Sequence, residues 1–187
     1  MNGVRARDAL DACRFKRQSY DFTNGEVHRS FTFTVDRVTV TAEMVAFCSQ
    51  TLPSLVTQEV TISTDSACEL AVQLGIDTTG APGHFDARAT ESDGSIGGAV
   101  DGSLRWASLG DVASVGAAYV TECDDAQAKC SLLEAKDLPL QTTYQIGAQP
   151  GERYRIRQFS TMVPSPAHSV PDQQAVRLAT EAKRKGS

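Results

Sequence analysis

The sequence predicts an all-β fold, a sandwich of two antiparallel sheets followed by a short C-terminal linker helix. The first observation is that apolar and polar residues alternate with a period of two, which is typical of strands with one buried face. The second is that these runs are short and bounded by turn-forming residues, with no long helical pattern between them. The third is that one helical pattern stands near the end of the chain.

Composition sets the class of protein. The chain has 187 residues, of which 41% are hydrophobic and 22% charged, values that suit one folded domain. A formal net charge of -5 argues against a nucleic-acid partner, because such proteins carry a basic face. No apolar stretch is long enough to span a bilayer, and the first residues lack the apolar core of a signal peptide. We therefore expect a cytoplasmic protein with neither a nucleic-acid nor a membrane partner.

The clearest strand pair comes early. Apolar residues alternate with threonine in FTFTV (31–35) and VTVTAEM (38–44), and Asp36-Arg37 interrupts the pattern. Valine and threonine fit a pleated surface because their branched side chains pack well there. The two runs are expected to face each other across a tight turn. Residues 1–24, which precede them, are expected to be an extension or a first strand.

Further strands follow as far as residue 163. Runs over 56–62 and 68–76 flank a turn at 63–66, and another strand is expected over 115–119. Residues 144–148 lead into a turn at 149–152 and a return strand from 153. Arg153, Arg155 and Arg157 share the outward face of this return strand. We expect them to pair with acids on a neighbouring strand; the alternative is a site for an anionic ligand.

The tail over 164–187 is expected to be a linker and helix. Pro171-Asp172 is a good helix start, and Gly186 after three basic residues is a good end. One small apolar stripe runs along this helix: Ala175, Val176, Ala179 and Ala182. The sequence thus divides into an extension over 1–24, a β-sandwich over 25–163 and a linker with its helix over 164–187.

The segment 80–102 is expected to be a long loop rich in glycine, alanine and acids. Four of its acids could in principle supply the carboxylate pair of a glycosidase, but solvated loop acids are the commoner case; they are Asp86, Glu91, Asp93 and Asp101. A second, weak candidate for sugar or domain contact combines aromatic and polar residues. Its members are His84, Phe85, Asp86 and Arg88. The alternative is that the loop folds Phe85 onto the sandwich.

Trp106, the single tryptophan, could stack on a sugar ring if it were exposed. Because Leu104 shares its parity, a core or half-buried position is expected instead. Cys48 and Cys68 are expected to be reduced, buried apolar residues. The six residues between Cys123 and Cys130 do not fit a zinc site, and the three histidines (His28, His84 and His168) lie far apart. No metal site, cofactor or catalytic residue is predicted.

Five stretches, taken in order, resemble a known family. They are GEVHRSF (25–31), AFCS (46–49), VTQEVTIST (56–64), LGID (74–77) and YRIRQFSTMVPSPAHSVPDQQAVRLATEAKRKG (154–186). Together they resemble the N-terminal β-sandwich and linker of glycoside hydrolase family 65, whose members hydrolyse or phosphorolyse α-glucosides such as trehalose, maltose and kojibiose. The resemblance covers most of the chain, although no single short signature carries it.

The resemblance implies a super-β-sandwich of the galactose-mutarotase type. It also implies a partner, an (α/α)6 catalytic barrel in the same or a separate chain, and an α-glucoside substrate. Inorganic phosphate would be required if the parent enzyme is a phosphorylase. In the family the catalytic residues lie in the barrel, so none is transferred to this sequence. The sandwich would pack on the barrel, shape the sugar site through residues 80–102 and support a homodimer.

Two other functions remain open. One is a stand-alone sandwich that binds carbohydrate or protein, which an exposed Trp106 or Tyr119 would support. The other is a small mutarotase-type enzyme, which needs an acid and a base, usually a histidine and a glutamate, on one sheet face. The enzyme ranks last because the three histidines are expected near turns or in loops.

Overall fold

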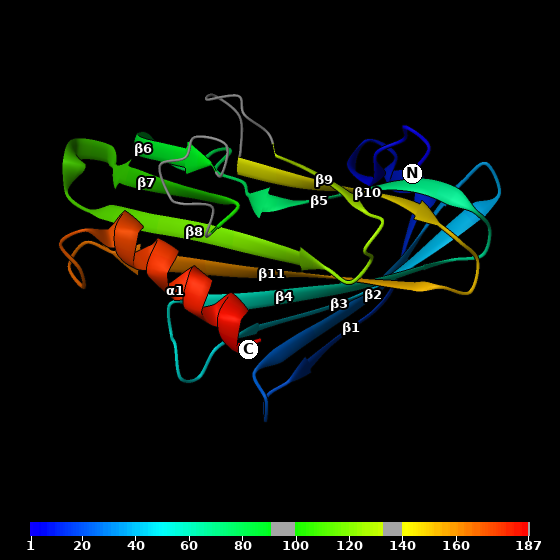
Figure 1. The fold of residues 1–187 in the computed structure, drawn as a ribbon, viewed down its shortest axis with the longest axis horizontal. Coiled ribbons are helices and arrows are strands. Elements are labelled where there is room, and N and C mark those ends of the chain that lie inside the picture. The colour runs from blue at the N-terminus through cyan, green and yellow to red at the C-terminus, as the bar shows by residue number, and fades with distance from the viewer. Residues whose placement is uncertain (91–99, 133–139, 187) are drawn as a thin grey trace.

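A computed structural model describes residues 1–90, 100–132 and 140–186, with the backbone alone for residues 86–90. Two antiparallel sheets face each other, with one α-helix outside them (Figure 1), so the predicted all-β sandwich is confirmed. The large sheet has the order β1-β2-β3-β4-β11-β8-β7-β6. Its strands are β1 (Cys13–Asp21), β2 (Glu26–Val35), β3 (Val38–Cys48), β4 (Leu55–Thr64), β6 (Gly83–Thr90), β7 (Gly102–Ser108), β8 (Ser114–Cys123) and β11 (Arg153–Pro164).

The small sheet has the order β5-β10-β9, with β5 (Cys68–Ile76), β9 (Lys129–Leu132) and β10 (Leu140–Ala148). The described residues also form the short 3-10 turns η1 (Ala6–Asp8), η2 (Leu10–Ala12) and η4 (Leu109–Asp111). The small sheet lies over part of the large one, and the remaining inner face of the large sheet extends beyond it (Figure 1).

The β2–β3 hairpin forms as the sequence predicts. Val35 pairs with Val38, and the two residues between them, Asp36 and Arg37, have φ values of 51° and 68°. Two successive positive φ angles are typical of the two-residue turn whose twist matches that of the flanking strands. The alternating threonines and valines therefore lie opposite each other along both strands.

The chain crosses between the sheets where a return strand was expected. β10 pairs with β5 and β9, whereas β11 pairs with β4 and β8, so the expectation that β11 pairs with β10 is wrong. The physical reason is burial. Ile146 of β10 and Ile156 of β11 are both fully buried in one core cluster, and they reach it from opposite sheets. A flat hairpin would have left one apolar face of each strand uncovered.

The main core fills the space between the sheets. From the large sheet it takes Phe33, Val40 and Ile62, and from the small sheet Leu70 and Ile146. A second cluster continues it toward β7 and β8, with Leu104, Ala117, Tyr119 and Leu140. Together the two clusters hold the large sheet, from β2 across to β7, against the small sheet.

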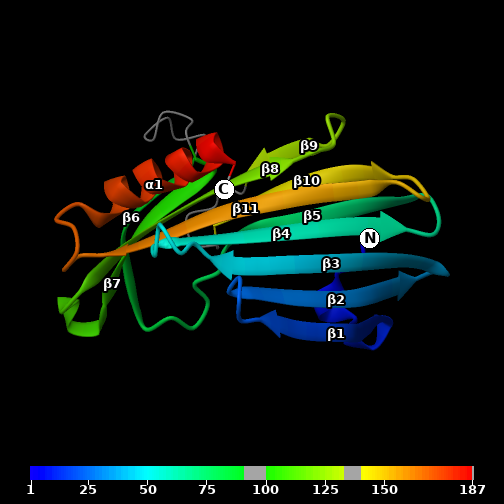
Figure 2. The same cartoon turned by 90° about the horizontal axis from the view of Figure 1, so that it is seen from below.

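The helix α1 (Pro171–Lys185) lies on the outer face of the large sheet, across β8 and β11 (Figure 2). Ala175, Ala179 and Ala182 have no exposed surface, so the predicted stripe is the packing face. Gly186 ends the helix at φ 66°, and its N–H donates to the carbonyls of Ala182 and Lys183, as predicted from its position. In the described part of the chain no helix is long and apolar enough to cross a bilayer.

Two local expectations are wrong. Residues 83–90 form strand β6, which pairs with β7 around a bulge between Phe85 and Ala87, so they are not part of a loop. The alanines and Gly83 in this segment hide the period of two, whereas pairing with β7 satisfies the hydrogen bonds of its backbone groups.

The expectation that Cys48 and Cys68 are buried is also wrong. Cys48, the last residue of β3, is exposed, and Cys68 is half-buried. Both residues are thiols outside any disulfide in the described part of the chain.

Candidate functional site

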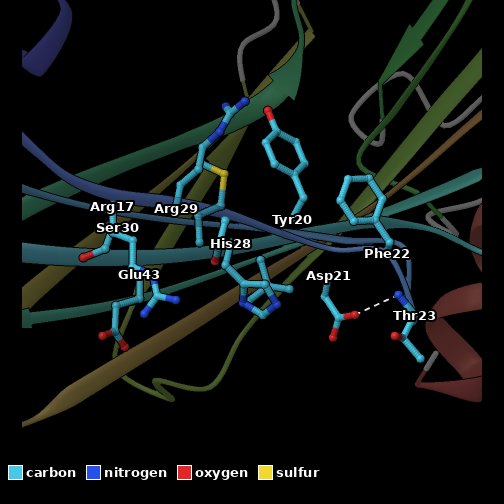
Figure 3. A pocket seen from close by; sticks show the side chains of 12 residues that line it. Arg17, Tyr20, Asp21, Phe22, Thr23, His28, Arg29, Ser30 and Glu43 are labelled. Atoms are coloured by element: carbon cyan, nitrogen blue, oxygen red, sulfur yellow. Dashed lines mark hydrogen bonds between the residues drawn. The ribbon is translucent and has the colours of Figure 1, made fainter.

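A pocket of about 760 Å³ lies at the edge of the large sheet, over β1, β2 and β3. Most of its lining side chains are polar or charged, and four are apolar or carry a benzene or phenol ring: Tyr20, Phe22, Met44 and Val45. The lining residues are Arg17, Ser19, Tyr20, Asp21, Phe22, Thr23, His28, Arg29, Ser30, Glu43, Met44 and Val45. Side chains alternate along a strand, so these residues divide into two groups. Figure 3 shows Tyr20, Phe22 and Arg29 extending to one side and Asp21, His28 and Glu43 to the other.

The polar group follows the strand register. Ser30 of β2 stands between Arg17 of β1 and Glu43 of β3, and one row further His28 stands between Ser19 and Val45. The short serines are flanked by the longer Arg17, Glu43 and His28, which leaves a hollow between charged tips. The Nε2 atom of His28 lies 2.9 Å from an oxygen of Glu26, and both side chains are partly exposed.

Asp21 shapes one end of this pocket. Its carboxylate accepts hydrogen bonds from the backbone N–H of Thr23 at 2.8 Å and of Asn24 at 3.3 Å. The bond from the Thr23 backbone, followed by that from Asn24, holds the pKa of Asp21 below its usual value. Asp21 is therefore an ionised acceptor that fixes the β1–β2 turn, and it is not suited to donate a proton at neutral pH.

His28 is the third residue of β2 and His84 the second residue of β6, so both lie in strands close to the preceding turn. The sequence reasoning passed over Glu26 and Glu43. The signal was present in the alternation of Glu26, His28 and Ser30 along one face of GEVHRSF. His28 lines the pocket and bonds to Glu26 beside it, and both side chains are partly exposed. Enclosed acid–base chemistry needs water to be excluded, so this geometry favours ligand binding by hydrogen bonds.

The residues singled out from the sequence lie at the opposite edge of the large sheet. His84 and Phe85 belong to β6 and Trp106 to β7. Phe85 pairs with Trp106 and shares its face, whereas His84 points to the other face, with Nε2 3.5 Å from a carboxylate oxygen of Asp111 in η4. The side chains of Asp86 and Arg88, and all of Glu91 and Asp93, lie outside the described residues.

Trp106 is half-buried, as expected, against the cluster of Leu104, Ala117 and Tyr119. Gly83 lies against its ring so closely that a β-carbon there would be 2.7 Å from two ring atoms. Its indole nitrogen is buried and makes no hydrogen bond within the described residues. Since Tyr119 is also buried, neither ring offers the exposed platform that would have supported a stand-alone sugar-binding sandwich.

A polar network crosses the core beside β7. Asp101 is half-buried, so the expectation of a solvated loop acid is wrong for this residue. One of its carboxylate oxygens accepts hydrogen bonds from the hydroxyls of Thr121 on β8 and Thr142 on β10, the latter at 2.8 Å. Thr121 also bonds the Tyr144 hydroxyl at 2.9 Å, and burial raises the pKa of Tyr144. The network joins both sheets to the start of β7.

Replacing Asp101 by alanine is expected to lower the free energy of unfolding by about 2 kcal/mol, because two buried hydroxyls lose their shared hydrogen-bond acceptor. Asp101→Asn is the matched control, since its amide oxygen can still accept both hydrogen bonds. Urea denaturation followed by circular dichroism measures both variants. Equal losses in the two would show that the network contributes through charge and not through its hydrogen bonds.

Two of the three arginines on the outward face of β11 pair with acids, as predicted: Arg155 and Arg157. Arg157 lies 2.6 Å from Glu122 on β8, and Arg155 lies 3.0 Å from Asp124 and 3.8 Å from Glu59 on β4. These are partly exposed pairs that align neighbouring strands and contribute little net stability. Among the described residues, no group of three or more His, Cys, Asp and Glu side chains could hold a metal ion.

Comparison with known proteins gives one family. The model described as "Glycosyl hydrolase family 65, N-terminal domain" matches residues 8–187. The structure is similar to that of "Putative kojibiose phosphorylase from human microbiome", with a TM-score of 0.73 at 11% identity. The match covers 94% of this chain and 23% of that one, so the chain spans about a quarter of the length of that protein.

A second solved structure, "Heparinase III-BT4657 gene product, Methylated Lysines", matches 81% of this chain and 21% of its own at 10% identity. Its TM-score of 0.23 is too low to support an argument. No curated protein matches the sequence.

Proposed function

Because the chain belongs to the N-terminal domain family of glycosyl hydrolase family 65, we propose that it is the non-catalytic front module of an α-glucoside hydrolase or phosphorylase. In this role it packs on an (α/α)6 catalytic barrel, carried in the same or a separate chain, and contributes to the shape of the sugar site and to a homodimer. The family match over residues 8–187 carries the proposal. If the parent is a phosphorylase, inorganic phosphate is its second substrate.

The surface proposed for the barrel is the β6–β7 edge with η4. Leu109 and Val112 are 73% and 87% exposed there, next to Asp111, which pairs with His84. Exposed aliphatic side chains gathered at one turn favour an interface over open solvent. Phe85, also exposed, lies in β6, within the segment 80–102 that is proposed to shape the sugar site. The weak sequence candidates His84 and Phe85 thus become contact residues.

The test uses the full enzyme that carries this module. Leu109→Asp is expected to weaken the module–barrel contact, so that limited proteolysis separates the two parts and sugar turnover falls at least tenfold. Leu10→Asp is a matched control, because Leu10 has the same exposure of 73% and lies in η2, away from η4. Equal behaviour of both variants would contradict the docking surface. The function itself would be contradicted if the native gene encoded no barrel and no separate barrel chain bound this module.

A further inference from the structure

The inner face of β1, β2 and β3 is covered at one end and open at the other. Phe33 and Val40, on the inner face of β2 and β3, are buried under the small sheet. By register, Tyr20 at the far end of β1 belongs to the same inner face, yet it is 55% exposed. Phe22, which follows β1, is 92% exposed. The small sheet does not cover these two rings, so they contribute little to the core.

The two rings form an ordered pair. Their centroids lie 6.2 Å apart with an interplanar angle of 21°, a stacked arrangement. The Tyr20 hydroxyl accepts a hydrogen bond from the Gln18 amide nitrogen, and the Gln18 amide oxygen accepts one from Nε of Arg29 at 3.0 Å. Gln18 therefore fixes Tyr20 and Arg29 relative to each other. Single exposed apolar residues are common, but stacked rings joined to a hydrogen-bonded polar chain are a prearranged surface.

The chemistry of this surface specifies its ligand. The ring faces need a flat partner with C–H groups, while Arg29 offers hydrogen-bond donors in a fixed plane at the rim. A pyranose ring has both features, because its C–H groups gather on one face and its hydroxyls surround the rim. The net charge of -5 disfavours a polyanion as the ligand.

We propose that Tyr20, Phe22 and Arg29, positioned by Gln18, form a binding platform for a neutral oligosaccharide. This site goes beyond the proposed function, since β1 and β6 are opposite edges of the large sheet and the barrel surface is assigned to β6. The platform would hold a glucan chain at a distance from the catalytic mouth.

The isolated chain tests the platform, with maltoheptaose and cellohexaose as neutral probes and heparin as an acidic one. Isothermal titration calorimetry is expected to show binding of a neutral probe, weakened about tenfold or more in Tyr20→Ala and in Phe22→Ala. Tyr20→Phe keeps the ring and is expected to lose less. Phe15→Ala is the control, because Phe15 is also exposed on β1 but is not part of the ring pair.

Three results would overturn the proposal: no binding of either neutral probe, unchanged binding in Tyr20→Ala and Phe22→Ala, or an equal loss in Phe15→Ala. Binding of heparin alone, lost in Arg29→Gln but not in Phe22→Ala, would identify an anion site and also contradict it. Circular dichroism confirms that each variant is folded. Leu109→Asp should leave the binding of the neutral probe unchanged, so the platform and the proposed barrel contact can fail independently.

Discussion

Replacement of Phe159 by alanine is expected to lower the free energy of unfolding by about 3–5 kcal/mol, because truncating a buried phenylalanine removes apolar contacts and leaves a cavity. Phe159 of β11 has no exposed surface and lies at the centre of the cluster that joins α1 to the large sheet. Its neighbours include Leu55 of β4 and the helix residues Ala175 and Ala179. The helix residues buried in this cluster are alanines, whose short side chains cannot reach into the cavity.

Chemical denaturation measures this loss, with Phe15→Ala as the control. Phe15 is 64% exposed, so its replacement is expected to change the free energy of unfolding by less than about 0.5 kcal/mol. Hydrogen exchange on the Phe159 variant should show α1 opening before the inter-sheet core, since that core uses different residues. A loss below about 1 kcal/mol would mean that the helix contributes little to the folded state.

Gly116→Ala is expected to cost about 3 kcal/mol, the upper end of what overpacking costs. A β-carbon at Gly116 of β8 would lie 2.1 Å from the backbone nitrogen of Asp172 and 2.1 Å from the carbonyl carbon of Pro171. The clash is with backbone at the first turn of α1, so no side-chain rotation relieves it. The helix start would have to move away from the sheet and uncover Pro171, which is buried.

Gly147→Ala is the matched control for this prediction. Gly147 is also a strand glycine, but a β-carbon there would meet only a carboxylate oxygen of Glu69, at 3.8 Å. Its replacement is expected to be neutral or to stabilise by up to about 1 kcal/mol, because alanine restricts the unfolded chain. Thermal unfolding compares the two proteins. If both variants melt at the same temperature, the close approach of α1 to β8 is not needed for stability.

The candidate sites show how far sequence reasoning reaches. The arginine stripe and its acids could be predicted, because alternation places them on one wet strand face. His28 and Glu26 were readable from the same alternation, although their pocket depends on β1 and β3 lying alongside. The platform of Tyr20, Phe22 and Arg29 could not be predicted. Its rings are exposed only because the small sheet ends before it reaches them. The sequence around Tyr20 and Phe22 does not show where the small sheet ends.

What the sequence by itself determined is local. Alternating apolar residues specify the strands, Asp36-Arg37 the tight hairpin and Pro171 to Gly186 the helix, because these features depend on neighbours a few residues apart. Only the tertiary structure decided which sheet each strand joins, that residues 83–90 pair with β7, and that Asp101 enters the core. Those outcomes depend on which apolar faces are buried against each other in the whole fold. Ile146 and Ile156 are only ten residues apart, yet they belong to opposite sheets and meet in one core, because that arrangement removes both side chains from water.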